Sequence, residues 1–256
     1  AMIRMTPQAE QRGQQCSAIA ADSLEGRLTD RSDARTGSQS RFLDRLFGPD
    51  LGRLTQEHIS LVAASLFIAV IFGVPLGAVA AFRKRAGHWI FGIVGLLQTI
   101  PALALLAALI PLLGQIGTVP AVVALSLYAL LPIVRNTATG LDQVPVGLKQ
   151  AGTALGMRPM QRWWLVDLPL ALPVILAGVK TAAVLTVGTA TIAAFIGAGG
   201  YGERIVQGLA LNDSAALLAG AIPSAVLALV TQGLFELLER LPRASRWMRH
   251  GSGSIR

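Results

Sequence analysis

Residues 150–169 read QAGTALGMRPMQRWWLVDLP and form a polar interruption between two long apolar runs of the chain. The stretch begins with small residues that suit a short helix, and Gly156 is placed to end it, because glycine readily adopts the left-handed conformation that closes a helix. Pro159 prevents an early restart. A basic and aromatic turn at 162–164 follows, and Leu168-Pro169 opens the next apolar run. An exposed helix in such a loop is suited to docking onto another protein, or to lying on a lipid surface.

The composition is that of a membrane protein. The 256 residues are 53% hydrophobic and 14% charged, whereas soluble domains carry about 25% charged residues. A net charge of +8 could suit a nucleic-acid partner. Beyond the first forty residues, however, the basic side chains cluster beside apolar runs, which is typical of membrane flanks. With aromatic residues at only 5%, a base-stacking surface is not indicated, so the sequence argues against nucleic-acid binding.

Five apolar runs approach or exceed the roughly 20 helical residues that cross a bilayer. They cover residues 59–82, 89–113, 119–134, 168–197 and 215–238. Residues 1–40 are expected to be a mobile polar tail, and residues 41–57 an amphipathic helix lying at the membrane interface. The sequence therefore predicts an all-α polytopic membrane protein with a transmembrane domain at 58–242. Within that domain, the loop 135–167 projects from the membrane, and a basic tail follows at 243–256.

Lys and Arg are unevenly divided between the two sides of the predicted membrane. Three follow the first run, four lie in the loop 135–167 and five follow the fifth run, whereas on the opposite side, apart from the segment before the first run, only Arg204 is found. The segment before the first run is neutral. The positive-inside rule therefore predicts that the loop and the C-terminus lie in the cytoplasm. Five spans then put the N-terminus outside.

Polar residues within the runs are candidates for a translocation pathway, because polar groups at membrane depth face protein or a cavity. Pro101 predicts a kink. For Gln98 and Thr99, the alternative role is a hydrogen bond to a neighbouring helix. Lys180 lies only about 18 Å into its run, so a snorkelling structural lysine is the alternative there. The full set of pathway candidates is Gln98, Thr99, Pro101, Tyr128, Lys180, Thr189 and Thr191.

The sequence contains no pattern that indicates catalysis or metal binding. Cys16 is the single cysteine, the three histidines are far apart, and GxxxxGK[ST], HExxH and GxSxG motifs are missing. Residues 197–202 (GAGGYG) match GxGxxG, but they follow an apolar helix rather than a strand, so we expect a flexible outer loop instead of a dinucleotide site. The sequence therefore predicts a chain that is not an enzyme and that has no metal or cofactor of its own.

The loop carries a resemblance to a known family. Gln150-Ala151-Gly152, three residues, Gly156, nine residues and Val166-Asp167-Leu168-Pro169 resemble the "EAA" loop of binding-protein-dependent ABC importer permeases. That pattern is Glu-Ala-Ala, three residues, Gly, nine residues, Ile-x-Leu-Pro, so this chain departs from it at positions 150, 152 and 166. Segments 98–105, 168–183 and 188–200 are similar to the osmoprotectant branch, which imports glycine betaine, choline, carnitine and related quaternary amines. The resemblance covers about residues 41–242.

The resemblance implies a type I importer (MetI-like) permease fold in a pair with a second copy or a sister permease. It also implies cytoplasmic ATPase subunits that hold ATP and Mg, and an extracytoplasmic substrate-binding protein. In this family the EAA helix inserts into a groove of the ATPase, where small side chains allow close approach and apolar ones act as anchors. The residues so implied in coupling are Gln150, Ala151, Gly152, Ala154, Leu155, Gly156, Met157, Arg158, Leu168 and Pro169.

Substrate selection and the class of transporter have alternatives. Quaternary amines are commonly held by aromatic cages, but Tyr128 is the only tyrosine in the central runs. We therefore expect the selective cage on the binding protein and a permissive pathway in this chain. Other betaines or amino acids are alternative substrates. A stand-alone channel or secondary transporter is a further alternative, although Glu236, near the inner end of the fifth run, is the only acid that would suggest ion coupling.

Overall fold

A computed structural model describes the backbone of residues 43–250 and the side chains of residues 43–239. The predicted tail 1–40 lies outside the described residues, as do residues 251–256. The chain from Pro49 onward forms one compact unit, which is the subject below. Its helical elements, in chain order, are α2 (Leu51–Phe82), α3 (Lys84–Thr99), α4 (Ala102–Leu113), α5 (Thr118–Asp142), α6 (Val146–Ala154), α7 (Pro159–Arg162), a π-helical turn (Trp163–Asp167), α8 (Leu168–Ala190), a 3₁₀ turn (Thr191–Ile196), α9 (Gly202–Ala210) and α10 (Ser214–His250).

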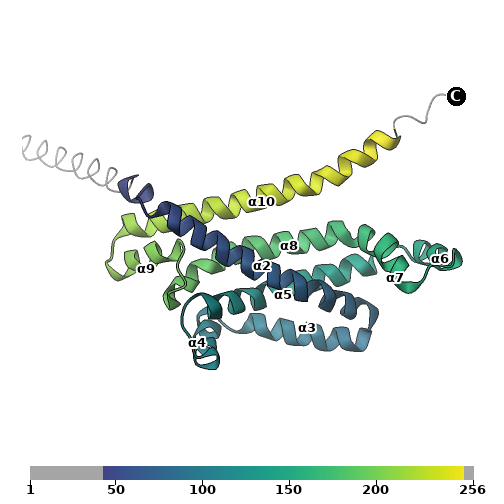
Figure 1. Cartoon of the computed structure of the whole chain (residues 1–256), viewed down its shortest axis with the longest axis horizontal. Coiled ribbons are helices and arrows are strands. Elements are labelled where there is room, and N and C mark those ends of the chain that lie inside the picture. Colours follow the sequence, from purple (N-terminus) through teal and green to yellow (C-terminus); the bar gives the residue numbers. More distant parts are fainter. Residues whose placement is uncertain (1–42, 251–256) are drawn as a thin grey trace, which may run out of the picture. The chain divides into compact units, whose positions relative to one another are not determined.

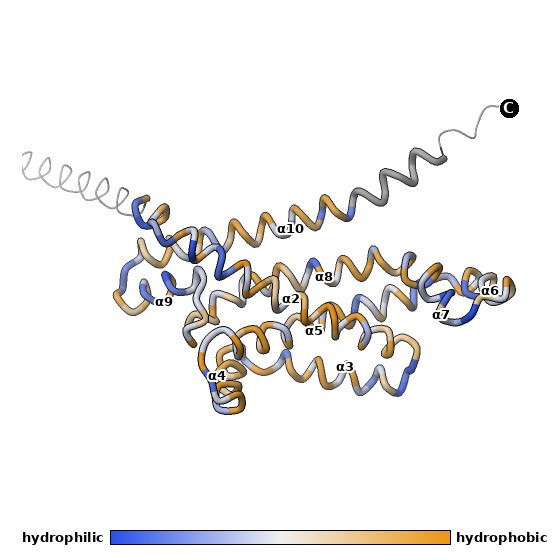
Figure 2. The backbone as a smooth tube through the Cα atoms, in the orientation of Figure 1, coloured by the Kyte–Doolittle hydropathy of each residue, from blue (hydrophilic) through white to orange (hydrophobic). Residues whose placement is uncertain are grey.

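The long helices alternate in direction (Figure 1). Helices α2, α5 and α10 run one way, α3 and α8 return, and the most extensive contacts are those of α5 with α2 and with α8. By length and apolar character, four helices of the described chain qualify as membrane spans, and the bent pair α3–α4 makes a fifth if it is one span. Apolar residues run along these helices and polar ones gather at the turns (Figure 2). The all-α architecture predicted from the sequence is thus confirmed.

Small residues at the crossing points allow the central helices to approach closely. A Cβ atom on Gly77 of α2 would lie 2.6 Å from the Cβ of Thr137 on α5, and one on Gly178 of α8 would lie 2.5 Å from the Cβ of Asn136. Because lipid tails are as apolar as the helix surfaces, close van der Waals packing of this kind is what associates helices in a membrane.

The first span begins earlier than predicted. Residues 51–57, assigned from sequence to a separate interfacial helix at 41–57, are the first turns of α2, and Gly48-Pro49 separate them from a short helical turn at 43–46. Charged residues in these first turns have partners in the fold. Arg53 donates to Glu203 at 2.8 Å, and Glu57 accepts from the Gly200 backbone N–H at 3.0 Å.

The third span is also longer than predicted, because α5 continues from 134 to Asp142 through the polar pair Arg135-Asn136. The Asn136 amide donates to the Pro132 carbonyl of its own helix at 2.8 Å. The predicted loop 135–167 therefore begins as helix. Likewise α10 extends to His250, so residues 243–250 of the predicted basic tail are helical.

The predicted kink at Pro101 is a sharp break. Helix α3 ends at Thr99, Ile100 has an extended backbone, and α4 leaves at an angle of 101° to α3. Helix α3 alone carries the chain back to the end at which α5 begins, and α4 lies there (Figure 1). The break follows from the missing N–H of proline and from its steric restriction on the preceding residue.

The glycine-rich segment 197–202, expected to be a flexible loop, is buried from Ala198 to Gly202. Gly199 and Gly200 have φ of +84° and +79°, and side chains at these positions would collide with Glu57 and His58. Tyr201 is 4% exposed, and its hydroxyl donates to Thr55 at 2.8 Å. The segment therefore fastens α9 to the start of α2.

Candidate functional site

Eight of the ten residues implied in coupling lie at 150–158, within a segment that we call the coupling segment, residues 146–167 (α6, α7 and the π-helical turn), and Leu168 and Pro169 begin α8. Gln150, Ala151, Gly152 and Ala154 lie on α6, which ends at Ala154 and is terminated, as predicted, by Gly156. Gly156 has φ of +75°, and the Met157 N–H donates to the Gly152 carbonyl at 3.1 Å, which closes the helix in the usual glycine-terminated geometry.

Most of the implied residues are exposed, as a docking surface requires. Gly152 is buried, Met157 and Leu168 are half-buried, and the others lie on the surface. Leu155 is 78% exposed. Sequence reasoning missed further exposed apolar side chains beside them, whose signal was their apolar character in an otherwise polar loop. These are Val146, Leu148, Met160, Trp164 and Leu165.

Arg162 holds the coupling segment together and joins it to α8. Its Nε donates to Asp167 Oδ2 at 3.3 Å, its Nη1 donates to Thr153 Oγ1 at 3.4 Å, and its aliphatic stem packs over Gly152. Lys149 Nζ also donates to the Leu141 carbonyl at the end of α5, at 2.9 Å. The segment is therefore fastened to both α5 and α8 by specific bonds.

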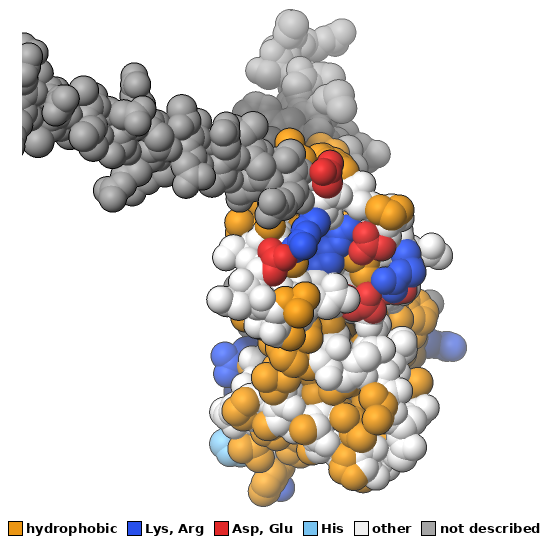
Figure 3. Space-filling model, turned by 90° about the vertical axis from the view of Figure 1, so that its left-hand side faces the viewer, with side chains coloured by type: hydrophobic (Ala, Val, Ile, Leu, Met, Phe, Trp, Pro, Cys, Tyr) orange, Lys and Arg blue, Asp and Glu red, His pale blue; other side chains and the backbone are white. Residues whose placement is uncertain are grey.

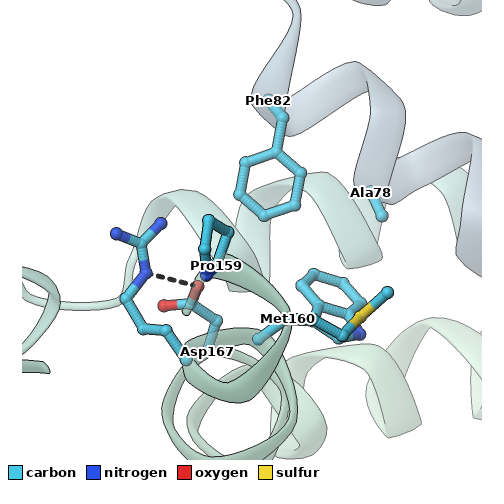
Figure 4. Close-up of a pocket in the computed structure, with 7 residues that line it drawn as sticks. Ala78, Phe82, Pro159, Met160 and Asp167 are labelled. Carbon is cyan, nitrogen blue, oxygen red and sulfur yellow. Dashed lines mark hydrogen bonds and ion pairs between the residues drawn. The ribbon is translucent and has the colours of Figure 1, made fainter. Parts of the chain in front are cut away.

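A pocket of about 480 Å³ separates the coupling segment from the end of α2 (Figure 4). Phe82 of α2 meets Trp163 edge to face, with ring centroids 5.5 Å apart. The remaining lining residues are Ala78, Pro159, Met160, Arg162 and Asp167. The coupling segment thus contacts α2 through Trp163 and adjoins α8 through Asp167.

A second cavity, of about 200 Å³, lies between α3, α5 and α8. It brings together three of the pathway candidates from three separate runs: Gln98, Tyr128 and Thr189. Sequence reasoning missed its other lining residues, although Thr186 is one helical turn from Thr189 and so shares its face. The missed residues are Leu125, Ala129, Leu185 and Thr186.

The other pathway candidates lie elsewhere. Thr99 is exposed and donates to Leu96 in its own helix at 2.7 Å, and Thr191 donates to the Gly188 carbonyl at 2.7 Å. Pro101 forms the α3–α4 break. Lys180 faces α10, where its Nζ is 3.2 Å from Glu239 Oε1. The ion pair fits the structural alternative for Lys180.

The cavity is uncharged, and its hydroxyl protons are already donated to backbone carbonyls. Thr186 and Thr189 donate to the residues four positions earlier, at 2.7 and 2.8 Å. Tyr128 donates to the Ile100 carbonyl, and Gln98 Nε2 donates to the Tyr128 carbonyl at 2.8 Å. What these side chains offer to a solute is therefore mainly oxygen lone pairs and an aromatic ring.

Ion pairs cover the opposite end of the helices, where α2 begins and α9 lies (Figure 3). The buried Arg204 donates to both carboxylate oxygens of Asp50, at 2.8 and 3.2 Å, and to the Ala219 carbonyl at 3.2 Å. The hydrogen bond from Arg204 holds the pKa of Asp50 below its usual value of 3.8. Together with the Arg53–Glu203 pair, this joins α9 to α2.

Comparison with known proteins identifies the family. Residues 73–244 match the model of the binding-protein-dependent transport system inner membrane component. The chain is 44% identical to the choline transport system permease protein OpuBB of Bacillus subtilis (75% of this chain, 88% of the relative). It is 45% identical to the osmoprotectant import permease protein OsmW of Salmonella typhimurium (74% and 90%) and 45% identical to the carnitine transport permease protein OpuCD of Listeria monocytogenes (72% and 82%).

Solved structures agree with this assignment. The inward-facing MetNI methionine ABC transporter matches with a TM-score of 0.69 at 25% identity, over 75% of this chain and 95% of that one. An amino acid ABC transporter with histidines matches in fold with a TM-score of 0.60 at 18% identity, over 76% and 94% of the two chains. The chain therefore belongs to the binding-protein-dependent transport system inner membrane components, the multi-pass permease subunits of ABC importers.

Proposed function

We propose that this permease imports quaternary-amine osmoprotectants, such as glycine betaine, choline or carnitine, with energy from a separate ATPase. The observation that carries the proposal is the neutral cavity between α3, α5 and α8. A quaternary ammonium has no N–H to donate, so it is suited to oxygen lone pairs and the face of Tyr128. The absence of charge on the cavity's lining residues suits a pathway that a cation must also leave. The names of the relatives favour the same substrates.

The coupling segment supports the proposal that a separate chain binds and hydrolyses ATP. Its exposed apolar residues, led by Leu155, surround a helix that is bonded to α5 and α8. Exposed apolar residues of this kind suit a protein partner, and ATP with Mg would be held by that partner, because this sequence has no phosphate-binding loop. In this arrangement the coupling segment and the C-terminus are cytoplasmic. The N-terminus and α9 are then outside, where a substrate-binding protein would dock, and a second permease subunit completes the pathway.

Uptake in cells that lack other osmoprotectant importers tests this proposal. The permease is expressed with an ATPase and a binding protein of its family, and the uptake of labelled choline and glycine betaine is measured. We expect uptake only when all components are present, and loss of uptake in Gly156→Glu at an unchanged amount of protein in the membrane. Uptake without the ATPase would instead indicate a channel or secondary transporter. Preferred uptake of an amino acid over both amines would contradict the substrate class.

A further inference from the structure

A proline in α5 leaves one backbone carbonyl without its helical partner. The Tyr128 carbonyl would normally accept from the N–H four residues later, but that residue is Pro132, which has none. A side chain from another helix takes this place, because Gln98 Nε2 of α3 donates to the Tyr128 carbonyl at 2.8 Å. A backbone carbonyl without a hydrogen-bond donor is unfavourable within a membrane, so the bond from Gln98 removes a free-energy cost.

A second hydrogen bond returns from α5 to the break between α3 and α4. The extended backbone of Ile100 takes its carbonyl out of the helix just before Pro101. The hydroxyl of Tyr128 donates to this carbonyl. The bend and α5 therefore exchange two hydrogen bonds, each of which satisfies a carbonyl left free by a proline or by the break.

Both side chains also form part of the wall of the 200 Å³ cavity. The direction of their hydrogen bonds separates two possible roles. A residue that selects a solute directs its donors and acceptors into the cavity, whereas Gln98 and Tyr128 direct their donors to backbone carbonyls of α5 and of the α3–α4 break. Thr186 and Thr189, on the facing side, belong to α8 and form no part of these two bonds.

We propose that Gln98 and Tyr128 are positioning residues, a clamp that holds the α3–α4 bend against α5 and thereby sets the shape of the transport cavity. The inference rests on the proposed function for its transport readout. The clamp acts on all solutes equally. Its loss therefore lowers the maximal rate of uptake without changing the preference between one quaternary amine and another.

The proline supplies a sharp test. Gln98→Leu leaves the Tyr128 carbonyl unpaired in the wild-type background. In Pro132→Ala, the new N–H of residue 132 can pair with that carbonyl inside α5, so Gln98 becomes dispensable. We expect Gln98→Leu to lower the maximal uptake rate at least about five-fold, which corresponds to about 1 kcal/mol, the lower bound for an unsatisfied buried carbonyl. In the Pro132→Ala background, the same substitution should cost less than about two-fold.

Two controls use matched changes. Pro75→Ala alters a proline inside α2, whereas Gln98 bonds a carbonyl of α5. Gln98→Leu should therefore keep its full effect in the Pro75→Ala background. Gln232→Leu removes an exposed glutamine whose bond at 3.2 Å stays within α10, and it should leave uptake unchanged. Tyr128→Phe deletes only the hydroxyl and should lower the maximal rate in the same way as Gln98→Leu, while the KM values for choline and glycine betaine keep their ratio.

Two results would overturn the clamp. One is an equal loss from Gln98→Leu in the wild-type and Pro132→Ala backgrounds. The other is a change in the choline-to-glycine-betaine KM ratio in Gln98→Leu or Tyr128→Phe, which would mean that the Gln98 amide or the Tyr128 hydroxyl itself contacts the solute. If the wild-type transports neither amine, the proposed function fails. The clamp is then tested by the thermal unfolding midpoints of the wild type, Gln98→Leu, Pro132→Ala and the double variant. The midpoint lost in Gln98→Leu should be mostly absent when the same substitution is made in the Pro132→Ala background.

Discussion

Gly178 marks the tightest approach between α5 and α8, and its replacement by alanine gives a strong prediction. The added Cβ would lie 2.5 Å from the Cβ of Asn136 and 2.8 Å from the Pro132 carbonyl oxygen. Favourable contacts between carbon atoms begin at about 3.5 Å, so the two helices must separate by roughly 1 Å. Neither neighbour is the free end of a flexible side chain. The crossing therefore cannot adjust by a rotamer change.

The magnitude follows from two opposing terms. Overpacking costs about 1–3 kcal/mol, and the higher helix propensity of alanine returns up to about 1 kcal/mol. With the full propensity gain, the net loss is up to about 2 kcal/mol, so at about 2–4 °C per kcal/mol for a unit of this size Gly178→Ala should lower the unfolding midpoint by up to about 8 °C. A Cβ added to Gly188 of the same helix would meet no atom within 4 Å, so Gly188→Ala is the matched control and should be neutral or stabilising.

Tryptophan fluorescence of the detergent-purified proteins, heated at one fixed scan rate, provides the measurement. The fixed rate matters because irreversible unfolding makes the midpoint depend on it. Equal midpoints for Gly178→Ala and Gly188→Ala would refute the reasoning, because they would show that α5 and α8 can accommodate an extra methyl group at their crossing without cost.

Three further predictions concern other contacts. Because the pKa of Asp50 is lowered from 3.8 by Arg204, its stabilising contribution is complete above pH 3.8 and is lost as pH falls through the lower folded-state pKa. Asp50→Asn should therefore make the unfolding midpoint fall less between pH 5 and pH 3. The difference corresponds to less than about 1 kcal/mol in the free energy of unfolding for this half-exposed carboxylate, and an unchanged acid profile would contradict it. Gly156→Ala places a side chain at φ of +75°, a strain of about 1–2 kcal/mol, so ATP-dependent uptake should fall while immunoblots show equal protein in the membrane. Lys180→Met leaves Glu239 without its ion-pair partner, so thermal stability should fall, and Lys180→Met/Glu239→Gln should regain most of it; no recovery in the double variant would argue against the pair.

Sequence patterns predicted the spans well because crossing a membrane requires long apolar helices, and composition records that directly. The start of α2 was predicted wrongly for an equally physical reason. The amphipathic pattern suggested an interfacial helix, yet Arg53 pairs with Glu57 one helical turn away and with Glu203, which is 150 positions away in the sequence. A local pattern cannot reveal such a partner, so it cannot tell a solvated charge from one paired across the fold.

Polar residues within apolar runs pointed to Gln98, Tyr128 and Thr189, and the fold gathers these three around one cavity. Their hydrogen-bond partners could not be predicted. Pro132 indicates from the sequence that the carbonyl four residues earlier lacks its helical hydrogen bond. Only the packing of α3 against α5 identifies the side chain that donates to that carbonyl. The same limit applied to Lys180, because its pairing with α10 depends on the arrangement of the helices.

The position of Gly178 bears on how α8 could move relative to α5. Helix α8 is a single helix of 23 residues, Leu168–Ala190, about 35 Å long. Its first residues adjoin Asp167, the partner of Arg162 in the coupling segment, and its last turns carry Thr186 and Thr189 of the cavity. Because Gly178, near its middle, leaves no space for sliding toward α5, we expect a push on one end to tilt α8 about that crossing. The close contact would then connect the coupling segment to the cavity wall.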